Sequence, residues 1–135
     1  MSARTKARKK ALDFLFAADL RGGEAENLYS TRVEDESPLS EEKYVEVILA
    51  GVKANQAQID ELISTYAQGW DMDRMPGIDR NILRIAIFEI LHEEATPDAV
   101  AISEAVELAQ ELSTRESSSY INGLLGRVVA IKSSL

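Results

Sequence analysis

The first ten residues of the chain concentrate positive charge. They contain no acidic residue and five basic ones: Arg4, Lys6, Arg8, Lys9 and Lys10. The whole chain has a net charge of −8, from 15 basic and 23 acidic residues, so the rest of it is strongly acidic. Because an acidic body repels nucleic acid while a basic segment attracts it, this separation predicts contact with an anionic partner at one place only.

An aromatic residue shares a helix side with one of these cations. At about 100° of rotation per residue, Phe16 lies close to the direction of Lys9 if this segment is helical. Aromatic rings stack on single-stranded bases, and basic side chains contact the phosphates. The pattern fits RNA binding. It also fits, more commonly, a ring that packs with Leu12 against a neighbouring helix.

The sequence offers no arrangement of residues typical of an enzyme. It has no cysteine and a single histidine, His92. It lacks the HExxH, G-x-S-x-G, P-loop and G-x-G-x-x-G motifs, so no nucleophile with an adjacent base is indicated. The row of Glu104, Glu107 and Glu111 is typical of a solvated helix face. We expect no catalysis, no cofactor and no metal ion.

Residues 78–91, IDRNILRIAIFEIL, are apolar on nearly every side of a helix. A helix of this kind is buried, whereas a surface helix shows a single apolar stripe. The length of the segment favours a helix over a strand. The polar residues near its start predict that the first turn emerges at a polar surface; they are Asp79, Arg80, Asn81 and Arg84. We expect this helix at the centre of the fold, with His92 at its end.

The elements around this central helix are also predicted to be helical. Apolar residues recur at helical spacing in segments 4–21, 24–32, 40–66 and 98–112, and from residue 117 onward. The pattern leaves open whether 40–66 is one bent helix or two. The stretch 33–42 is predicted to be a solvated acidic turn, and 71–77 a connector after Trp70, a residue that typically fills the core. Gly123 and Gly126 predict a close approach of another helix to the last one.

These patterns predict an all-α protein of six or seven helices. The length of 135 residues is typical of one domain. No stretch of about 18 apolar residues exists, so we expect no membrane span and no membrane partner. The absence of cysteine is compatible with a reducing compartment, and we expect the protein to be cytoplasmic.

Five segments together resemble one known family, the NusB family of bacterial transcription antitermination factors. They are KARKKALDFLF, ILAGVKANQAQID, WDMDRMPGIDRNILRIAIFEIL, AISEAVELAQELS and YINGLLG, in this order. The resemblance covers essentially the whole chain. It implies a helical fold of two small packed bundles, with residues 1–70 in an N-terminal subdomain and 71–135 in a C-terminal one.

The resemblance also implies a function and partners. Members of the family bind boxA, a short single-stranded RNA element of ribosomal-RNA leader transcripts, together with the ribosomal protein called NusE in this context. They then act on RNA polymerase with other Nus factors and suppress termination. The oligomeric state stays open, since some family members form a homodimer.

The resemblance further implies which residues contact RNA. The family's arginine-rich motif falls on the cations at positions 4, 6, 8, 9 and 10, and its RNA-contacting aromatic near the end of the first helix falls on Phe16. An acidic contact falls on Asp79, beside Arg80, and the family's FVNG motif falls on Tyr120 and Asn122. Two departures stand out. The N-terminal motif mixes lysine with arginine, and lysine lacks the planar fork of arginine. Ser119 replaces a basic residue that is common before the FVNG aromatic.

Two other functions are compatible with the sequence. A NusB-like domain is appended to some RNA methyltransferases, although this chain has no βαβ unit to bind their cofactor. A pure protein-interaction module would use the basic N-terminus against an acidic partner. Comparing matched and scrambled RNA in a salt titration would separate RNA binding from that last alternative.

Overall fold

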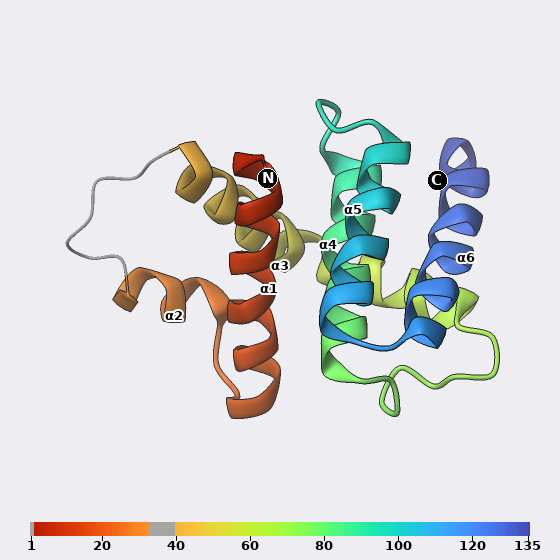
Figure 1. The fold of residues 1–135 in the computed structure, drawn as a ribbon, viewed down its shortest axis with the longest axis horizontal. Helices are drawn as coiled ribbons and strands as arrows, with labels where there is room; N and C mark the ends of the chain where they lie inside the picture. Colours follow the sequence, from red (N-terminus) through yellow and green to blue (C-terminus); the bar gives the residue numbers. More distant parts are fainter. Residues whose placement is uncertain (1, 33–39) are drawn as a thin grey trace.

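The computed structural model describes residues 2–32 and 40–135, which form six α-helices and a short 3-10 helix (Figure 1). In chain order they are α1 (Ala3–Arg21), α2 (Ala25–Arg32), α3 (Ser40–Tyr66), α4 (Gly77–His92), α5 (Asp98–Leu112), α6 (Arg115–Ile131) and η1 (Lys132–Ser134). These residues contain no strand, which confirms the all-α prediction. Of the predicted acidic turn at 33–42, residues 33–39 lie outside the described part of the chain. No helix of the described part could span a membrane.

Local sequence signals set the helix ends. The Ser2 side chain caps α1, and Gly22, whose φ of +77° suits glycine, follows the last residue of that helix. The Thr114 side chain caps α6, which therefore begins at Arg115, two residues earlier than predicted. Residues 40–66 form a single helix of 27 residues rather than two.

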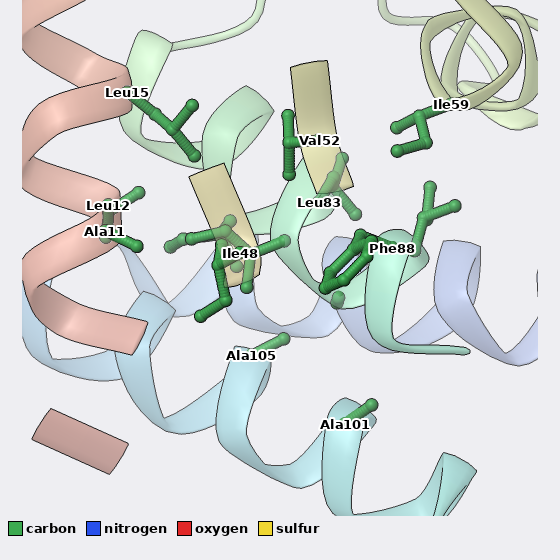
Figure 2. Close-up of a cluster of buried hydrophobic side chains, with 14 of the residues drawn as sticks. Ala11, Leu12, Leu15, Ile48, Val52, Ile59, Leu83, Phe88, Ala101 and Ala105 are labelled. Atoms are coloured by element: carbon green, nitrogen blue, oxygen red, sulfur yellow. The ribbon is translucent and has the colours of Figure 1, made fainter. Parts of the chain in front are cut away.

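The helix α4 is the centre of the fold, as predicted. It contacts α1, α3, α5 and α6, and every residue from 81 to 90 is buried. Figure 2 shows Leu83 and Phe88 of α4 among apolar side chains from the helices around it, including Leu12, Ile48 and Ala105. The division into subdomains at residues 70 and 71 stays a prediction, because α4 contacts helices on both sides of that boundary.

The start of α4 is not the polar surface that the sequence predicted. Asp79 and Asn81 are fully buried, and Arg84 is 7% exposed. Apart from Oδ1 of Asp79, their polar groups have partners inside the molecule. Arg84, for example, forms ion pairs with Asp19 of α1 and Asp60 of α3. A polar residue within an apolar run can be buried when a partner satisfies it, and the sequence alone does not show such a partner.

A buried ion pair joins α1 to α4. The guanidinium of Arg8, 3% exposed, donates to both carboxylate oxygens of Glu89, 1% exposed, at 2.8–3.1 Å. Tyr44 of α3 donates its hydroxyl to the same carboxylate. Burial alone would lower the pKa of Arg8, but the hydrogen bond and charge of Glu89 outweigh burial and raise it. Three helices are thus tied together by one satisfied polar cluster.

Close helix approach occurs at a different glycine from the predicted ones. A Cβ atom at Gly51 of α3 would lie 2.0 Å from Cε1 of the buried Phe88 ring. Gly123 and Gly126 are exposed, and a Cβ there would meet nothing within 4 Å. The prediction that Gly123 and Gly126 permit a close approach is therefore wrong, because they lie on the solvent side of α6.

Replacing these glycines with alanine should have opposite effects on stability. Gly51→Ala should lower the free energy of unfolding by about 1–3 kcal/mol, because the added methyl overpacks the contact with Phe88. Gly123→Ala should raise it by about 0.5–1 kcal/mol, because alanine favours a helix and has free space there. Urea unfolding of both variants measures the difference. A stabilised Gly51→Ala protein would contradict the close packing of α3 on α4.

The polar cluster should make the protein sensitive to alkali. Burial, together with the hydrogen bond to Glu89, raises the pKa of Tyr44 to about 12, whereas an unfolded tyrosine ionises near pH 10. The stabilisation from this neutral phenol should therefore be complete below pH 10 and decline as the pH rises toward 12. Between pH 10 and pH 12, the free energy of unfolding should fall more steeply with pH for the wild type than for Tyr44→Phe. Parallel curves would show that Tyr44 ionises normally.

Candidate nucleic-acid interface

The cations predicted on α1 are only partly available to a ligand. Arg4, Lys6 and Lys10 have exposed side chains. The Arg4 guanidinium lies over the Tyr44 ring, 4.3 Å from its centroid, and donates to the Thr96 hydroxyl. Lys9 is half-buried and pairs with Glu111 of α5, whose hydrogen bond and charge raise the pKa of Lys9.

Arg8 departs from the expectation of an exposed basic strip. Its guanidinium is enclosed and pairs with Glu89 and, at 3.3 Å, with Glu104. In this structure the charge of Arg8 is directed into the protein. The missed signal was Glu89, a lone acid inside an apolar helix, which requires a buried cation.

The Phe16 ring lies against the start of α4. A Cβ at Gly77 would lie 2.9 Å from Cε2 of this ring, so the missing side chain of Gly77 makes room for it. Phe16 remains partly exposed. The ring therefore combines both sequence interpretations: one part packs on a neighbouring helix, and another part is open to a ligand.

A charged cluster beside Phe16 fixes the relation of α1 to α4. Asp19 accepts hydrogen bonds from Arg80, Asn81 and Arg84 at 2.9–3.2 Å. Partial burial would raise the pKa of Asp19, but these donors outweigh burial and hold the pKa below its usual value. Arg80, predicted to contact RNA, also donates to the carbonyl of Met72 in the connector. It is half-buried at the same end of α4 as Phe16.

Tyr120 lies on the other flank of this region. Its ring packs edge-on against Trp70, with centroids 5.0 Å apart and an interplanar angle of 86°. Its hydroxyl is buried without a hydrogen-bond partner, although the residue as a whole is partly exposed. The exposed part of Tyr120 is thus the ring rather than the hydroxyl. Trp70 is partly buried against the core, in agreement with its predicted role.

Asp79 departs from the expectation of a surface acceptor. Its side chain has no exposed area, and its Oδ2 accepts a hydrogen bond of 2.6 Å from the Ser117 hydroxyl. Its Oδ1 is buried without a partner. The Asp79–Ser117 contact joins the first turn of α4 to the first turn of α6, one turn before Tyr120.

Asn122 and Tyr120 do not share a surface. Two residues of helix rotate the side chain by about 200°, so they lie on opposite flanks of α6. Asn122 is exposed and lines a shallow groove between α5 and α6. Ile102 and Val106 of α5 line the opposite wall of this groove.

Three of the predicted residues lie toward one end of the molecule: Phe16, Arg80 and Tyr120. The cations at positions 4–10 lie on the N-terminal half of α1, toward its other end. The last turns of α1 and the first turns of α4 and α6 lie at the lower end of Figure 1. There Phe16 lies against the start of α4, and Ser117, one turn before Tyr120, binds Asp79 in its first turn. Trp70, in the segment between α3 and α4, packs on Tyr120. Sequence reasoning missed the bridging role of α5: Glu104 and Glu111 were expected to face water, yet both pair with α1.

Comparisons with known proteins agree on one family. The model of the NusB family matches residues 5–130. The chain is 49% identical to the transcription antitermination protein NusB of Nocardioides sp., over 100% of this chain and 99% of that protein.

Solved structures share the fold. NusB of T. maritima has 30% sequence identity and a TM-score of 0.85, with 98% of this chain and 97% of that one covered. A crystal structure of the antitermination factors NusB and NusE in complex with dsRNA contains a chain with a TM-score of 0.84 and 22% identity, covering 96% and 98%. The fold, the family match and the relatives agree that this is a non-catalytic antitermination factor and a member of the NusB family.

Proposed function

We propose that this protein binds single-stranded boxA RNA together with the ribosomal protein NusE and modifies RNA polymerase in the cytoplasm so that it passes terminators. The observation that carries the proposal is the meeting of three helix ends with two partly exposed aromatic rings. Phe16 of α1 lies against Gly77 at the start of α4. Tyr120 of α6 packs on Trp70 and lies one turn after Ser117, which binds Asp79 in the first turn of α4.

This geometry suits a single strand better than a paired helix. Sequence-specific RNA recognition relies on unstacked bases that lie on aromatic rings and present their edges to the protein. The two partly exposed rings are candidates for such stacking. Phe16 lies against Gly77, and Tyr120 packs against Trp70. We assign the phosphates of the same strand to exposed cations on the N-terminal half of α1; they are Arg4, Lys6 and Lys10.

In this proposal, two of the residues implied by the family resemblance do not contact RNA. They are buried and position the helices that carry the two rings. Arg8 holds α1 against α4 through Glu89. Asp79 holds the start of α6 through Ser117 and thereby sets the position of Tyr120. Both are positioning residues, since neither side chain reaches the surface in the free protein.

The comparisons support this function over the RNA methyltransferase alternative. The relatives in Nocardioides and in Salinispora tropica are transcription antitermination proteins, matched over 99% and 96% of their own lengths. A structural neighbour was crystallised with NusE and dsRNA, which supports RNA and NusE as the two classes of partner and leaves the single-stranded form to the geometry. Binding of boxA and scrambled RNA, each with and without NusE, tests the proposal. Equal, weak binding of both RNAs under all conditions would contradict it.

Removing the Phe16 ring should weaken RNA binding specifically. Phe16→Ala should cost about 1–3 kcal/mol of binding free energy for boxA RNA, because one stacking contact is lost. Phe14→Ala is the matched control: it removes the same ring from the same helix, but Phe14 packs against Tyr29 on the opposite side of α1. Fluorescence anisotropy measures the RNA affinity of both variants at a temperature at which both are folded. Equal losses in both variants would place the RNA elsewhere.

Tyr120 should tolerate loss of its hydroxyl but not of its ring. The hydroxyl is buried without a partner, and burial raises the pKa of Tyr120. Tyr120→Phe should therefore keep RNA affinity and unfold at the same or a higher temperature. Tyr120→Ala should lose about 1–3 kcal/mol of binding free energy. If Tyr120→Phe lost as much affinity as Tyr120→Ala, the hydroxyl would be the recognised group and the stacking assignment would fail.

A further inference from the structure

Polar side chains bridge the N-terminal part of α1, residues 5–9, to α5. Both helices run from the upper to the lower end of Figure 1. The Thr5 hydroxyl donates to Glu104 at 2.7 Å, Arg8 pairs with the same carboxylate at 3.3 Å, and Lys9 pairs with Glu111. Carboxylates of α5 therefore lie against the basic segment of α1 in the free protein.

The two bridging acids differ in how firmly they are held. The side chain of Glu104 is 17% exposed and binds both Thr5 and Arg8. The side chain of Glu111 is 49% exposed, and its partner Lys9 is 39% exposed. Ion pairs with this much solvent contact contribute little to stability. A phosphate group can therefore displace Glu111 from Lys9 at small cost, whereas Glu104 is part of the folded framework.

Lys9 lies where a bound strand would need a cation. Rotation along α1 brings Lys9 to the same side of the helix as Phe16, whose ring is partly exposed. A strand stacked on Phe16 and running along α1 would bring a phosphate toward Lys9. The ammonium of Lys9 is already paired in the free protein.

We propose that Glu111 is an affinity-limiting residue: its carboxylate occupies Lys9 in the free protein and is displaced by an RNA phosphate on binding. Binding then exchanges one ion pair for another, so Lys9 contributes less to affinity than an unpaired cation would. The inference rests on the proposed RNA-binding function. It concerns affinity rather than base preference, since phosphate contacts position a strand without reading its sequence.

The chain provides a matched control on the same helix. Glu107 lies one turn before Glu111, is exposed, and forms no ion pair with any residue of the described ranges 2–32 and 40–135. Glu107→Gln and Glu111→Gln each remove one negative charge from α5. They therefore change the long-range electrostatic attraction to RNA by similar amounts, and only Glu111→Gln releases Lys9.

The test is a salt titration of RNA binding by the wild type, Glu107→Gln and Glu111→Gln, each with and without Lys9→Met. Glu111→Gln should bind boxA and scrambled RNA about 1.5- to 5-fold more tightly than Glu107→Gln, the range expected for an exposed ion pair. It should also steepen the salt dependence by up to about 0.7 slope units, the value for one phosphate contact on a single strand. With Lys9→Met, the two glutamine variants should become equal.

The outcomes separate this inference from the function on which it rests. If the wild type binds RNA but Glu111→Gln matches Glu107→Gln, the competition is absent and the inference is overturned alone. The same conclusion follows if the advantage of Glu111→Gln persists with Lys9→Met, because the effect would then not pass through Lys9. If the wild type binds neither RNA in the presence or absence of NusE, the proposed function fails and this inference fails with it.

Discussion

The buried ion pair between Arg8 and Glu89 is the interaction on which the arrangement of the other residues depends. Two charges removed from water are tolerated only when they satisfy each other, and here Tyr44 and Glu104 complete the cluster. The pair sets the position of α1 on α4. Because Phe16 lies two turns further along α1, its place beside Gly77 follows from the same attachment.

On the proposed function, this constraint explains how an acidic protein would present one surface to RNA. The basic segment has two roles: Arg8 serves the interior, whereas Arg4, Lys6 and Lys10 remain at the surface. The acids of α5 reduce the free positive charge further by pairing with α1. In the proposed complex, fewer free cations would limit non-specific binding, which is driven by phosphates alone. More of the discrimination would then come from stacking and base-edge contacts.

Most of the fold could be predicted from the sequence, because apolar periodicity reports burial directly. Residues 78–91 were apolar all round, and the helix they form is central. The site was predicted less well. Whether Asp79 faces solvent depends on Ser117, 38 residues away, and the position of Arg8 depends on Glu89, 81 residues away. Periodicity along one helix does not show which distant residue completes a polar pair. It also made Gly123 a contact residue, although the closely packed glycines are Gly51 and Gly77.

A double-mutant cycle on Arg8 and Glu89 tests the central claim most directly, with unfolding free energy as the measurement. Arg8→Met and Glu89→Met should each cost about 3–5 kcal/mol, because each removes the main partner of a buried charge. The double variant should cost much less than the sum of the two. Losses below about 1 kcal/mol that simply add would contradict the account, since Arg8 would then be a solvent-accessible cation rather than the residue that holds α1 in place.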